Sequence, residues 1–313
     1  MSRPLAFTKM TGAGNDFLIV DATQRRVQLK TPWARVSRAL CDRHLGVGAD
    51  GLLVLEPSRG ADVRMRIFNP DGSEAAMCGN GARCVARYVA DGRAHANGYP
   101  VSIKTGAGVL SARVQGDRVA MRMPDPTEIR LGLRLRVGGR RVAADVINTG
   151  VPHAVVRVRR LNAVDIEGLG RALRRHRAFG PRGTNVNFLE RDAHDPHRVR
   201  IRTYERGVEA ETLACGTGVV AAAVIHALTQ RRGARAGTCR MRVQTRSKDD
   251  LTVSMTLTAR GGRIRVTDVV LEGPARRICE GTVSWSHHLR RIVDPPRRFQ
   301  AAWRVGKPRS QWK

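Results

Sequence analysis

One sequence pattern occurs twice in this chain, and it limits the fold more than any other feature. The pattern E-x-x-x-C-G-x-G-x-x-x-x-A covers EAAMCGNGARCVA, residues 74–86, and again ETLACGTGVVAAA, residues 211–223. Corresponding positions in the two copies lie 137 residues apart. In both places the flanking sequence predicts strands and a turn followed by an Ala-rich helix. An internal duplication is the simplest explanation, and it predicts two halves with the same α/β plan.

Each copy of the pattern places a cysteine, Cys78 or Cys215, at the predicted start of a helix. Unpaired N–H groups and the helix dipole stabilise a thiolate at such a position. The glycine that follows each cysteine lets backbone amides approach an anion such as a carboxylate. If the two sites face each other, one sulfur can take a proton and the other can return one from the opposite face. That arrangement would invert a stereocentre.

The remaining cysteines have no such context. Six cysteines in 313 residues are too few for a dense disulfide framework, and the sequence contains no CxxC pair. The CDRH segment, residues 41–44, has no second pair at zinc-finger spacing, so we expect no metal site. The position equivalent to Cys84 in the second copy is Ala221. We therefore expect four cysteines to act as small buried hydrophobic residues, namely Cys41, Cys84, Cys239 and Cys279.

The chain is strongly basic, with 56 Lys and Arg residues against 27 acids and a net charge of +29. Binding of nucleic acid through its phosphates is one interpretation. An accumulation of Arg on solvated faces is the other, and two features favour it. Aromatic residues for base stacking make up only 4% of the chain, and the arginines are spread along it. We expect nonspecific adhesion to polyanions at low salt and no specific nucleic-acid partner.

Local signals divide the chain into three parts. Helices are predicted at residues 33–41, at 165–176 and from Cys215 to 229, while MPDPTEIR, residues 123–130, is typical of a linker. The predicted division is 1–130 with Cys78, 131–281 with Cys215, and a basic tail at 282–313. The tail carries Trp285, Trp303 and Trp312. We expect a weakly ordered extension, and a docked segment is the alternative because the tryptophans would otherwise be exposed.

Two further observations bear on the cellular location. No stretch of the sequence approaches the roughly 18 uninterrupted apolar residues of a membrane span. The N-terminal sequence MSRPLAFTKMTGAGND lacks the apolar core of a signal peptide. We therefore expect a cytoplasmic protein with no membrane partner. The sequence allows a homodimer but does not specify the oligomeric state.

With these residues in view, the sequence resembles the diaminopimelate epimerase family, a group of cofactor-independent two-cysteine epimerases. The resemblance runs from about Thr8 to Gly281. Seven motifs match in order: KMTGAGNDF (9–17), DRHLGVGAD (42–50), FNPDGSEAAMCGNGARC (68–84), NTGVPH (148–153), TNVNF (184–188), YERGVEAETLACGTG (204–218) and LEGPA (271–275). The family fold implied is α/β (α+β), with two pseudo-symmetric domains. Each would be a mostly antiparallel sheet wrapped around a central helix, with the active site in the interdomain cleft.

The resemblance implies epimerisation of L,L-2,6-diaminopimelate to the meso isomer, a step of lysine and cell-wall precursor synthesis. Cys78 and Cys215 would be the catalytic acid/base pair. In this direction Cys215 would accept the α-proton and Cys78 would donate one, and the roles would exchange in reverse. The substrate would be a small amino acid, and the family uses neither pyridoxal phosphate nor another cofactor.

The resemblance also implies roles for residues around the cysteines. His153 and Glu205 match positions thought to tune the thiols, although a lone His can also be purely structural. The far amino acid head group needs amide, carboxylate and guanidinium partners. The matching positions are Asn15, Asn69, Asn185, Glu205 and Arg206. Backbone donors for the carboxylate at the reacting carbon would come from Gly79-Asn80 and Gly216-Thr217.

The chain departs from the family pattern at three places. Many relatives carry Gln at the position of Gly51 and Asn at the position of Val151. The loop RGVEAETLACG, residues 206–216, is one residue longer than the common form. All three lie on substrate-recognition segments, whereas both cysteines are intact. A racemase or epimerase of the same fold for another amino acid, such as histidine or proline, therefore stays open, and a basic nucleic-acid-binding protein is the third alternative.

Overall fold

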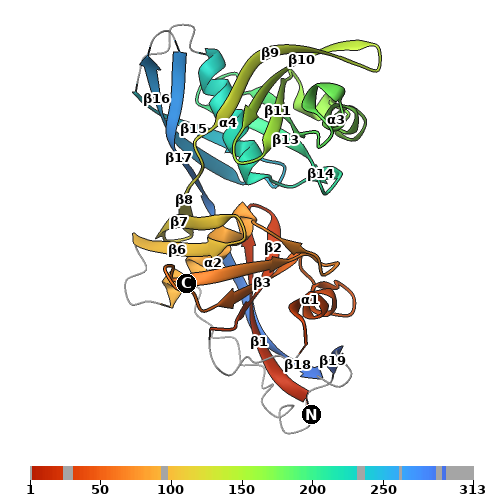
Figure 1. Cartoon of the computed structure of the whole chain (residues 1–313), viewed down its shortest axis with the longest axis vertical. Coiled ribbons are helices and arrows are strands. Elements are labelled where there is room, and N and C mark those ends of the chain that lie inside the picture. Colours follow the sequence, from red (N-terminus) through yellow and green to blue (C-terminus); the bar gives the residue numbers. More distant parts are fainter. Residues whose placement is uncertain are drawn as a thin grey trace, which may run out of the picture.

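The protein forms two lobes that follow each other along the chain, as seen in the computed structural model (Figure 1). The structure describes residues 2–23, 31–92, 98–230, 237–260, 263–286 and 291–293. The lower lobe in Figure 1 holds the strands and helices up to β8, and the upper lobe holds β9 to β17. The predicted fold class, α+β with two pseudo-symmetric halves, is confirmed.

The N-terminal half is a mixed sheet that is mostly antiparallel. Its strands hydrogen-bond in the order β1-β2-β3-β4-β6-β7-β8, and only the pairs β2/β3 and β4/β6 are parallel. The strands are β1 (Ser2–Gly12), β2 (Asn15–Asp21), β3 (Gly51–Glu56), β4 (Val63–Phe68), β5 (Glu74–Ala75), β6 (Tyr99–Thr105), β7 (Gly108–Gln115) and β8 (Arg118–Arg122). The short β5 pairs with β4 just before the central helix begins.

The C-terminal half repeats this plan. Its order is β10-β11-β12-β13-β15-β16-β17, with β11/β12 and β13/β15 parallel and the short β14 paired with β13. The strands are β10 (Arg140–Asn148), β11 (Pro152–Arg157), β12 (Asn185–Arg191), β13 (Arg198–Glu205), β14 (Ala210–Thr212), β15 (Gly237–Gln244), β16 (Asp250–Arg260) and β17 (Arg263–Pro274). The matching strand orders are what the sequence duplication predicts.

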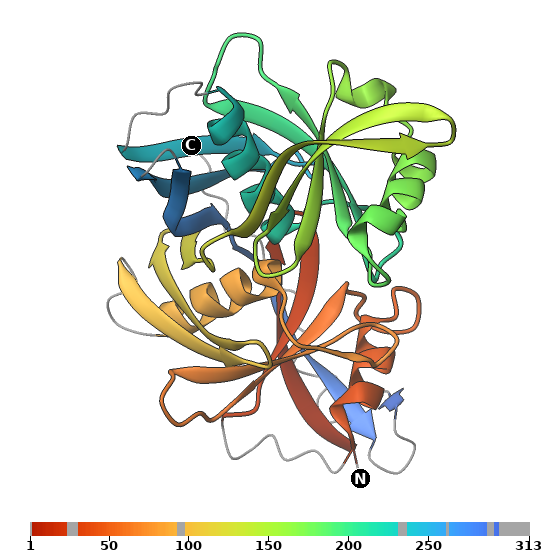
Figure 2. The same ribbon diagram turned by 45° about the horizontal axis from the view of Figure 1, so that its top comes forward.

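One helix lies inside each sheet (Figure 2). The helix α2 (Gly79–Asp91) packs Ala82, Val85 and Ala86 into the N-terminal core. Its equivalent α4 (Gly216–Gln230) is buried on every side from Gly218 to Ala227, which explains why it is apolar all round. The outer helices α1 (Trp33–Cys41) and α3 (Ile166–Arg174) also occupy equivalent places in the two halves. All of these helices fall where the sequence predicts them.

Two strands cross the predicted boundaries, and the second of them completes the N-terminal half. The strand β9 (Thr127–Val137) pairs with β10, and β18 (Arg276–Ser286) pairs with β1. A further pairing of β8 with β17 joins the two halves. The predicted boundaries at 130/131 and 281/282 therefore lie inside β9 and β18. Residues 127–130 belong to a strand rather than to a linker, because they pair with β10 despite the nearby prolines.

The predicted tail begins inside the sheet as well. Residues 282–286 are the second part of β18, and Trp285 is fully buried against the core that contains Leu5 and Leu40. Its indole Nε1 donates to Thr31 Oγ1 at 3.3 Å. The short β19 (Arg291–Val293) extends this pairing. Trp303 and Trp312 lie outside the described residues.

The cysteines expected to be buried follow that expectation with one exception. Cys41, Cys84 and Cys239 are buried, but Cys279 is exposed. Cys279 lies in the first part of β18, where five consecutive residues from Arg276 to Glu280 are exposed. The expectation for Cys279 was wrong because this part of the strand covers no core. No disulfide joins any of the six cysteines, all of which lie in the described part of the chain.

Two features are absent from the described segments. No helix there is both long and apolar enough to cross a membrane. No group of three or more His, Cys, Asp and Glu side chains there is arranged to hold a metal ion.

Candidate active site

Cys78 is the N-cap residue of α2. Its backbone is extended, with φ −142° and ψ 118°, and the Gly81 N–H donates to its Sγ at 3.5 Å. The Ala82 N–H donates to the Cys78 carbonyl at 2.9 Å, which forms the first hydrogen bond of the helix. The side chain of Cys78 therefore takes the place of a Ser or Thr cap, where N–H groups favour a negative charge on sulfur.

Cys215 has the same relation to α4. The Val219 N–H donates to the Cys215 carbonyl at 2.9 Å, and the Thr217 hydroxyl lies 3.4 Å from Cys215 Sγ. Both cysteines directly precede the first residue of their helix, as the duplicated pattern predicts. The sequence therefore places one thiol at the N-terminus of each central helix.

A hydrogen-bond network joins the two helix starts. The buried Asn80 donates its amide to Asn15 Oδ1 at 2.7 Å and to the Ala214 carbonyl at 3.3 Å. Asn15 in turn donates to Asp50 Oδ2 at 3.0 Å. Ala214 directly precedes Cys215, so this network connects the first turn of α2 with the residue before the second thiol. Asn80 thus acts here through its side chain, whereas the sequence had suggested its backbone.

The electrostatic environment places both thiols near one carboxyl group. Burial is the largest cause that raises the pKa of each thiol, and it raises that of Cys215 to about 12. The charge of Glu205 raises both pKa values as well, while nearby N–H groups oppose the rise. Burial also raises the pKa of the Glu205 carboxyl. The contact of α2 with α4 and the Asn80–Ala214 hydrogen bond bring both helix starts to the junction of the halves, and the charge of Glu205 acts on both thiols there.

His153 is fully buried on β11, and its tautomer follows from its partner. Asn187 can only donate from Nδ2, which lies 3.0 Å from His153 Nδ1, so Nδ1 accepts and Nε2 carries the proton. Within the described part of the chain, Nε2 has no hydrogen-bond partner. Burial, helped by the charge of Arg206, lowers the pKa of His153 to about 3. His153 is therefore a neutral side chain that offers one unused N–H donor.

Asn187 is a site residue that the sequence reasoning missed. Its Oδ1 accepts from Thr203 Oγ1 at 2.9 Å, which fixes the direction of the amide toward His153. A Cβ at Gly218, on the first turn of α4, would lie 2.3 Å from that same oxygen. The signal was present in TNVNF, because Asn185 and Asn187 are two residues apart on one strand and so share a face.

Asn185 and Arg206 are brought together by the ends of two neighbouring strands. Asn185 Oδ1 accepts from the Arg206 N–H at 2.9 Å, and its Nδ2 donates to the Pro152 carbonyl at 3.1 Å. Both ends of this amide therefore hydrogen-bond to the backbone. One partner is Pro152, which precedes His153, and the other is Arg206, which follows Glu205. The contacts indicate that Asn185 positions the strand ends, in addition to the substrate role expected from the sequence.

Asn69 and Gly51 are not part of the hydrogen-bond network between the helix starts as the structure describes it. Asn69 follows β4, is exposed, and donates to Ser73 Oγ at 2.9 Å. The hydrogen bonds described for it do not connect it with Asn15 or Asn80. Gly51 is the first residue of β3, and a Cβ there would lie 3.2 Å from the Phe68 carbonyl. A side chain at this position would require the end of β4, where Phe68 lies, to shift slightly.

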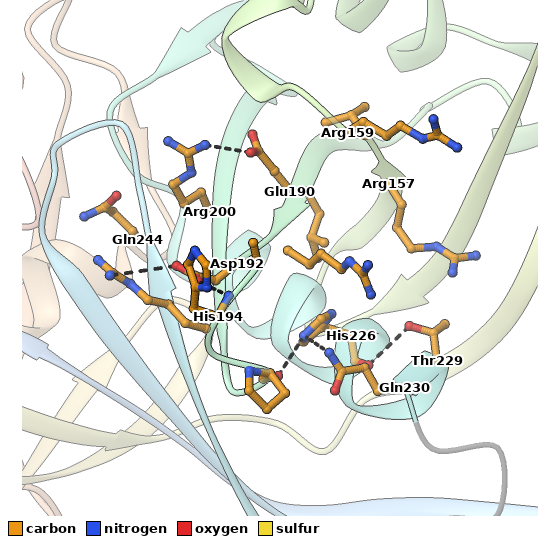
Figure 3. Close-up of a pocket in the computed structure, with 16 residues that line it drawn as sticks. Arg157, Arg159, Glu190, Asp192, His194, Arg200, His226, Thr229, Gln230 and Gln244 are labelled. Atoms are coloured by element: carbon orange, nitrogen blue, oxygen red, sulfur yellow. Dashed lines mark hydrogen bonds and ion pairs between the residues drawn. The ribbon is translucent and has the colours of Figure 1, made fainter.

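A large groove lies elsewhere, on the outer side of the C-terminal half (Figure 3). Its volume is about 1370 Å³, and none of the predicted site residues lines it. Arg157, Arg159 and Arg200 point along its walls, and Glu190 accepts from Arg200 at 2.7 Å. His226 lies at its floor, where its Nε2 is 3.0 Å from the Pro196 carbonyl. The basic groove is thus separate from the two cysteines.

Comparison with known proteins shows the family of this chain. The family model for diaminopimelate epimerase matches residues 7–129 and 146–267. A diaminopimelate epimerase of Methanocella arvoryzae is 39% identical over 296 residues, which cover 89% of this chain and 96% of that protein. One of Chlorobaculum tepidum is 38% identical over 276 residues and covers 88% and 100%. One of Archaeoglobus fulgidus is 44% identical over 237 residues and covers 71% and 81%.

Solved structures share the fold at low sequence identity. A phenazine biosynthesis protein of the PhzF family from Bacillus anthracis superposes with a TM-score of 0.67 at 17% identity, covering 90% of this chain and 99% of that one. A probable proline racemase from Agrobacterium radiobacter gives 0.64 at 18% identity, covering 90% and 93%. The solved structures thus share the fold, and the diaminopimelate epimerase relatives define the protein as an isomerase of the epimerase type. The chain belongs to the diaminopimelate epimerase family.

Proposed function

We propose that this protein interconverts L,L-2,6-diaminopimelate and the meso isomer by a two-base mechanism. The observation that carries the proposal is the pair of thiols, Cys78 and Cys215, each at the start of a central helix and joined by the Asn80–Ala214 hydrogen bond. Membership of the diaminopimelate epimerase family supports the choice of substrate. The product would serve lysine and cell-wall precursor synthesis.

The chemistry balances without a cofactor. With the L,L isomer bound, the Cys215 thiolate removes the α-proton and becomes a thiol. The electron pair left on the α-carbon is stabilised through the adjacent carboxylate, toward which the N–H groups of the two helix starts are directed. The Cys78 thiol then delivers its proton to the opposite face and becomes a thiolate. One C–H bond breaks and one forms, so the α-carbon is inverted and the total number of protons is unchanged.

Different groups of surrounding residues would bind the two ends of the substrate. Gly79-Asn80 and Gly216-Thr217 would supply the backbone donors for the carboxylate at the reacting carbon. The unused Nε2–H of His153 would donate to an acceptor within the site, either substrate or a thiolate. Arg206, Glu205 and the amides of Asn15, Asn69 and Asn185 would face the distant head group.

A racemase or epimerase for another amino acid is the second candidate. The observation that favours it is the recognition side of the site, where Gly51 and Val151 replace the Gln and Asn of many relatives. A Cβ at position 51 would lie 3.2 Å from the Phe68 carbonyl oxygen, so a side chain there requires that neighbour to move slightly. The far end of the substrate would then be held differently from the family pattern.

The test is an exchange assay in heavy water under reducing conditions. The purified protein is incubated with L,L-diaminopimelate, meso-diaminopimelate, L-histidine or L-proline, and deuterium at the α-carbon is followed by NMR. We expect exchange and interconversion of the two diaminopimelate isomers in the wild type, and no interconversion in the Cys78→Ala or Cys215→Ala variant. General acid–base groups contribute about 10²–10⁴-fold each, so the loss should be near complete. Exchange confined to histidine or proline would overturn the substrate assignment.

A further inference from the structure

Arg83 is a buried cation close to Cys78, and its charge has no carboxylate partner. It lies on α2, five residues after Cys78, and is fully buried. Its Nη2 donates to Asn80 Oδ1 at 2.7 Å and its Nη1 to the Gly79 carbonyl at 3.5 Å. Its Nε is buried without a hydrogen-bond partner in the described part of the chain. Both acceptors are neutral, and no carboxylate of the described residues forms an ion pair with it.

Such a charge is unfavourable unless something compensates it. Removing a guanidinium from water costs several kcal/mol, and neutral acceptors offset only part of this cost. Burial lowers the pKa of Arg83, yet a guanidinium stays protonated at neutral pH. Nε also faces the backbone of β17, because a Cβ at Gly273 would lie 3.2 Å from it. The junction of the halves therefore contains a fixed positive charge that lacks a fixed counter-ion.

The groups that can carry a negative charge near Arg83 are Cys84, Cys78 and Asp249. Cys84 is fully buried in the apolar core, whereas Cys78 is only partly buried and its Sγ accepts from the Gly81 N–H at 3.5 Å. Asp249 already accepts from Arg276 at 3.3 Å. Cys78 remains as the group whose ionisation would compensate the guanidinium. The other charged group that faces Cys78 is Glu205, which acts against ionisation.

The duplication provides an internal comparison. The residue equivalent to Arg83 in the second copy is Val220, which is buried in the apolar core around α4. Cys215 therefore has no cation on its own helix, while the charge of Glu205 and the neighbouring Cys78 both oppose its ionisation. The two thiols occupy equivalent places at their helix starts, but only Cys78 has a buried positive charge on its own helix.

We propose that Arg83 keeps the resting thiolate on Cys78 and the resting proton on Cys215, and that it positions Asn80 between the two halves. This inference rests on the proposed two-thiol function and specifies its resting state. A thiolate on Cys78 is ready to take a proton from the meso isomer. Turnover of the L,L isomer must then begin with a transfer of the proton from Cys215 to Cys78. Arg83 acts through Cys78 and Asn80, so it is a positioning residue.

The experiment measures each thiol separately and needs no substrate. Cys78 is followed in the Cys215→Ala variant, and Cys215 in the Cys78→Ala variant. The rate of alkylation by iodoacetamide is measured against pH by peptide mass spectrometry, and the midpoint of the rise is compared. We expect the midpoint of Cys78 to lie below that of Cys215. The additional substitution Arg83→Met should raise the Cys78 midpoint by about one pH unit or more and leave Cys215 nearly unchanged. The substitution Arg83→Lys should restore it in part.

A matched control is Arg87→Met, one turn further along α2, where Arg87 pairs with Asp91 at the surface. This variant should leave both midpoints unchanged. Equal shifts of both midpoints in Arg83→Met would reduce Arg83 to a structural residue and overturn the inference. If the Arg83→Met protein does not fold, the inference is still tested by the order of the two alkylation midpoints with Arg83 in place. A Cys78 midpoint at or above the Cys215 midpoint would overturn the inference. Because no substrate is used, failure of the proposed function would show separately, in the exchange assay.

Discussion

Asn80 donates its side-chain amide to the carbonyl oxygen of Ala214 at 3.3 Å, across the junction of the two halves. Asn80 is the second residue of α2, and Ala214 precedes Cys215 at the start of α4. The duplicated elements therefore meet at the residues next to both thiols. The geometry between the sulfurs depends on how the halves pack as well as on each helix alone.

Replacing Glu205 by Gln should move the acidic limb of the pH–rate profile. The Glu205 charge raises the pKa of both thiols, so its removal allows a thiolate to form at lower pH. We expect the low-pH midpoint of kcat/KM to fall by about one unit, together with a lower maximal rate. Glu190→Gln, in the outer groove, is the control and should leave the midpoint in place. A midpoint that moves to higher pH would contradict this account of Glu205.

Replacing Gly218 by Ala should impair catalysis more than folding. The new Cβ would lie 2.3 Å from Asn187 Oδ1, so Asn187 must move away from His153. Overpacking of this kind costs about 1–3 kcal/mol of the free energy of unfolding, whereas a small displacement in a site can cost about 10²-fold in rate. Gly92→Ala is the control, since its Cβ would be 3.6 Å from the nearest atom. Full activity of Gly218→Ala would show that Asn187 is not needed in its present place.

The pH dependence of stability should report the neutral state of His153. Its pKa is about 3 in the folded protein and near 6.5 in the unfolded chain, so between these values the unfolded chain binds more protons. Stability therefore falls as the pH drops below about 6.5. Between pH 7 and 5 the wild type should lose about 2 kcal/mol more than His153→Gln. Urea unfolding at the two pH values measures this, and an equal loss in both proteins would contradict the assignment.

Replacing Trp285 by Ala should destabilise the N-terminal half. Trp285 is fully buried, so the loss should be about 3–5 kcal/mol of the free energy of unfolding. The matched control on the same strand is Cys279→Ala, which removes an exposed thiol and should change stability by less than about 0.5 kcal/mol. Chemical denaturation provides both values. A Trp285→Ala protein as stable as the control would mean that residues 282–286 form no part of the core.

Local patterns were sufficient to predict the helices and the position of both thiols, because caps, glycines and apolar spacing act within a few residues. The return of β18 to the N-terminal half could not be predicted in this way. It depends on pairings such as Ser2 with Ser286, which no local signal encodes. The prolines before β9 also indicated a linker, yet pairing with β10 overrides that local preference.

The site shows the same limit. Cys78 and Cys215 stood out because they are repeated, whereas Arg83 resembled the many other arginines of the chain. Its burial arises only when the second half packs over the start of α2, near Gly273. Asn187 was detectable from its alternation with Asn185, but its role depends on the contact with His153 on the neighbouring strand.

The central claim is that one thiol removes the proton and the other delivers a different one. The most direct measurement is epimerisation of L,L-diaminopimelate in heavy water, stopped at low conversion, with deuterium measured separately in product and in recovered substrate. A two-base mechanism predicts product that carries deuterium at the inverted carbon while the recovered L,L isomer is nearly free of it. Product that retains the original proton would contradict the account, because it would mean that a single base returns the proton it removed.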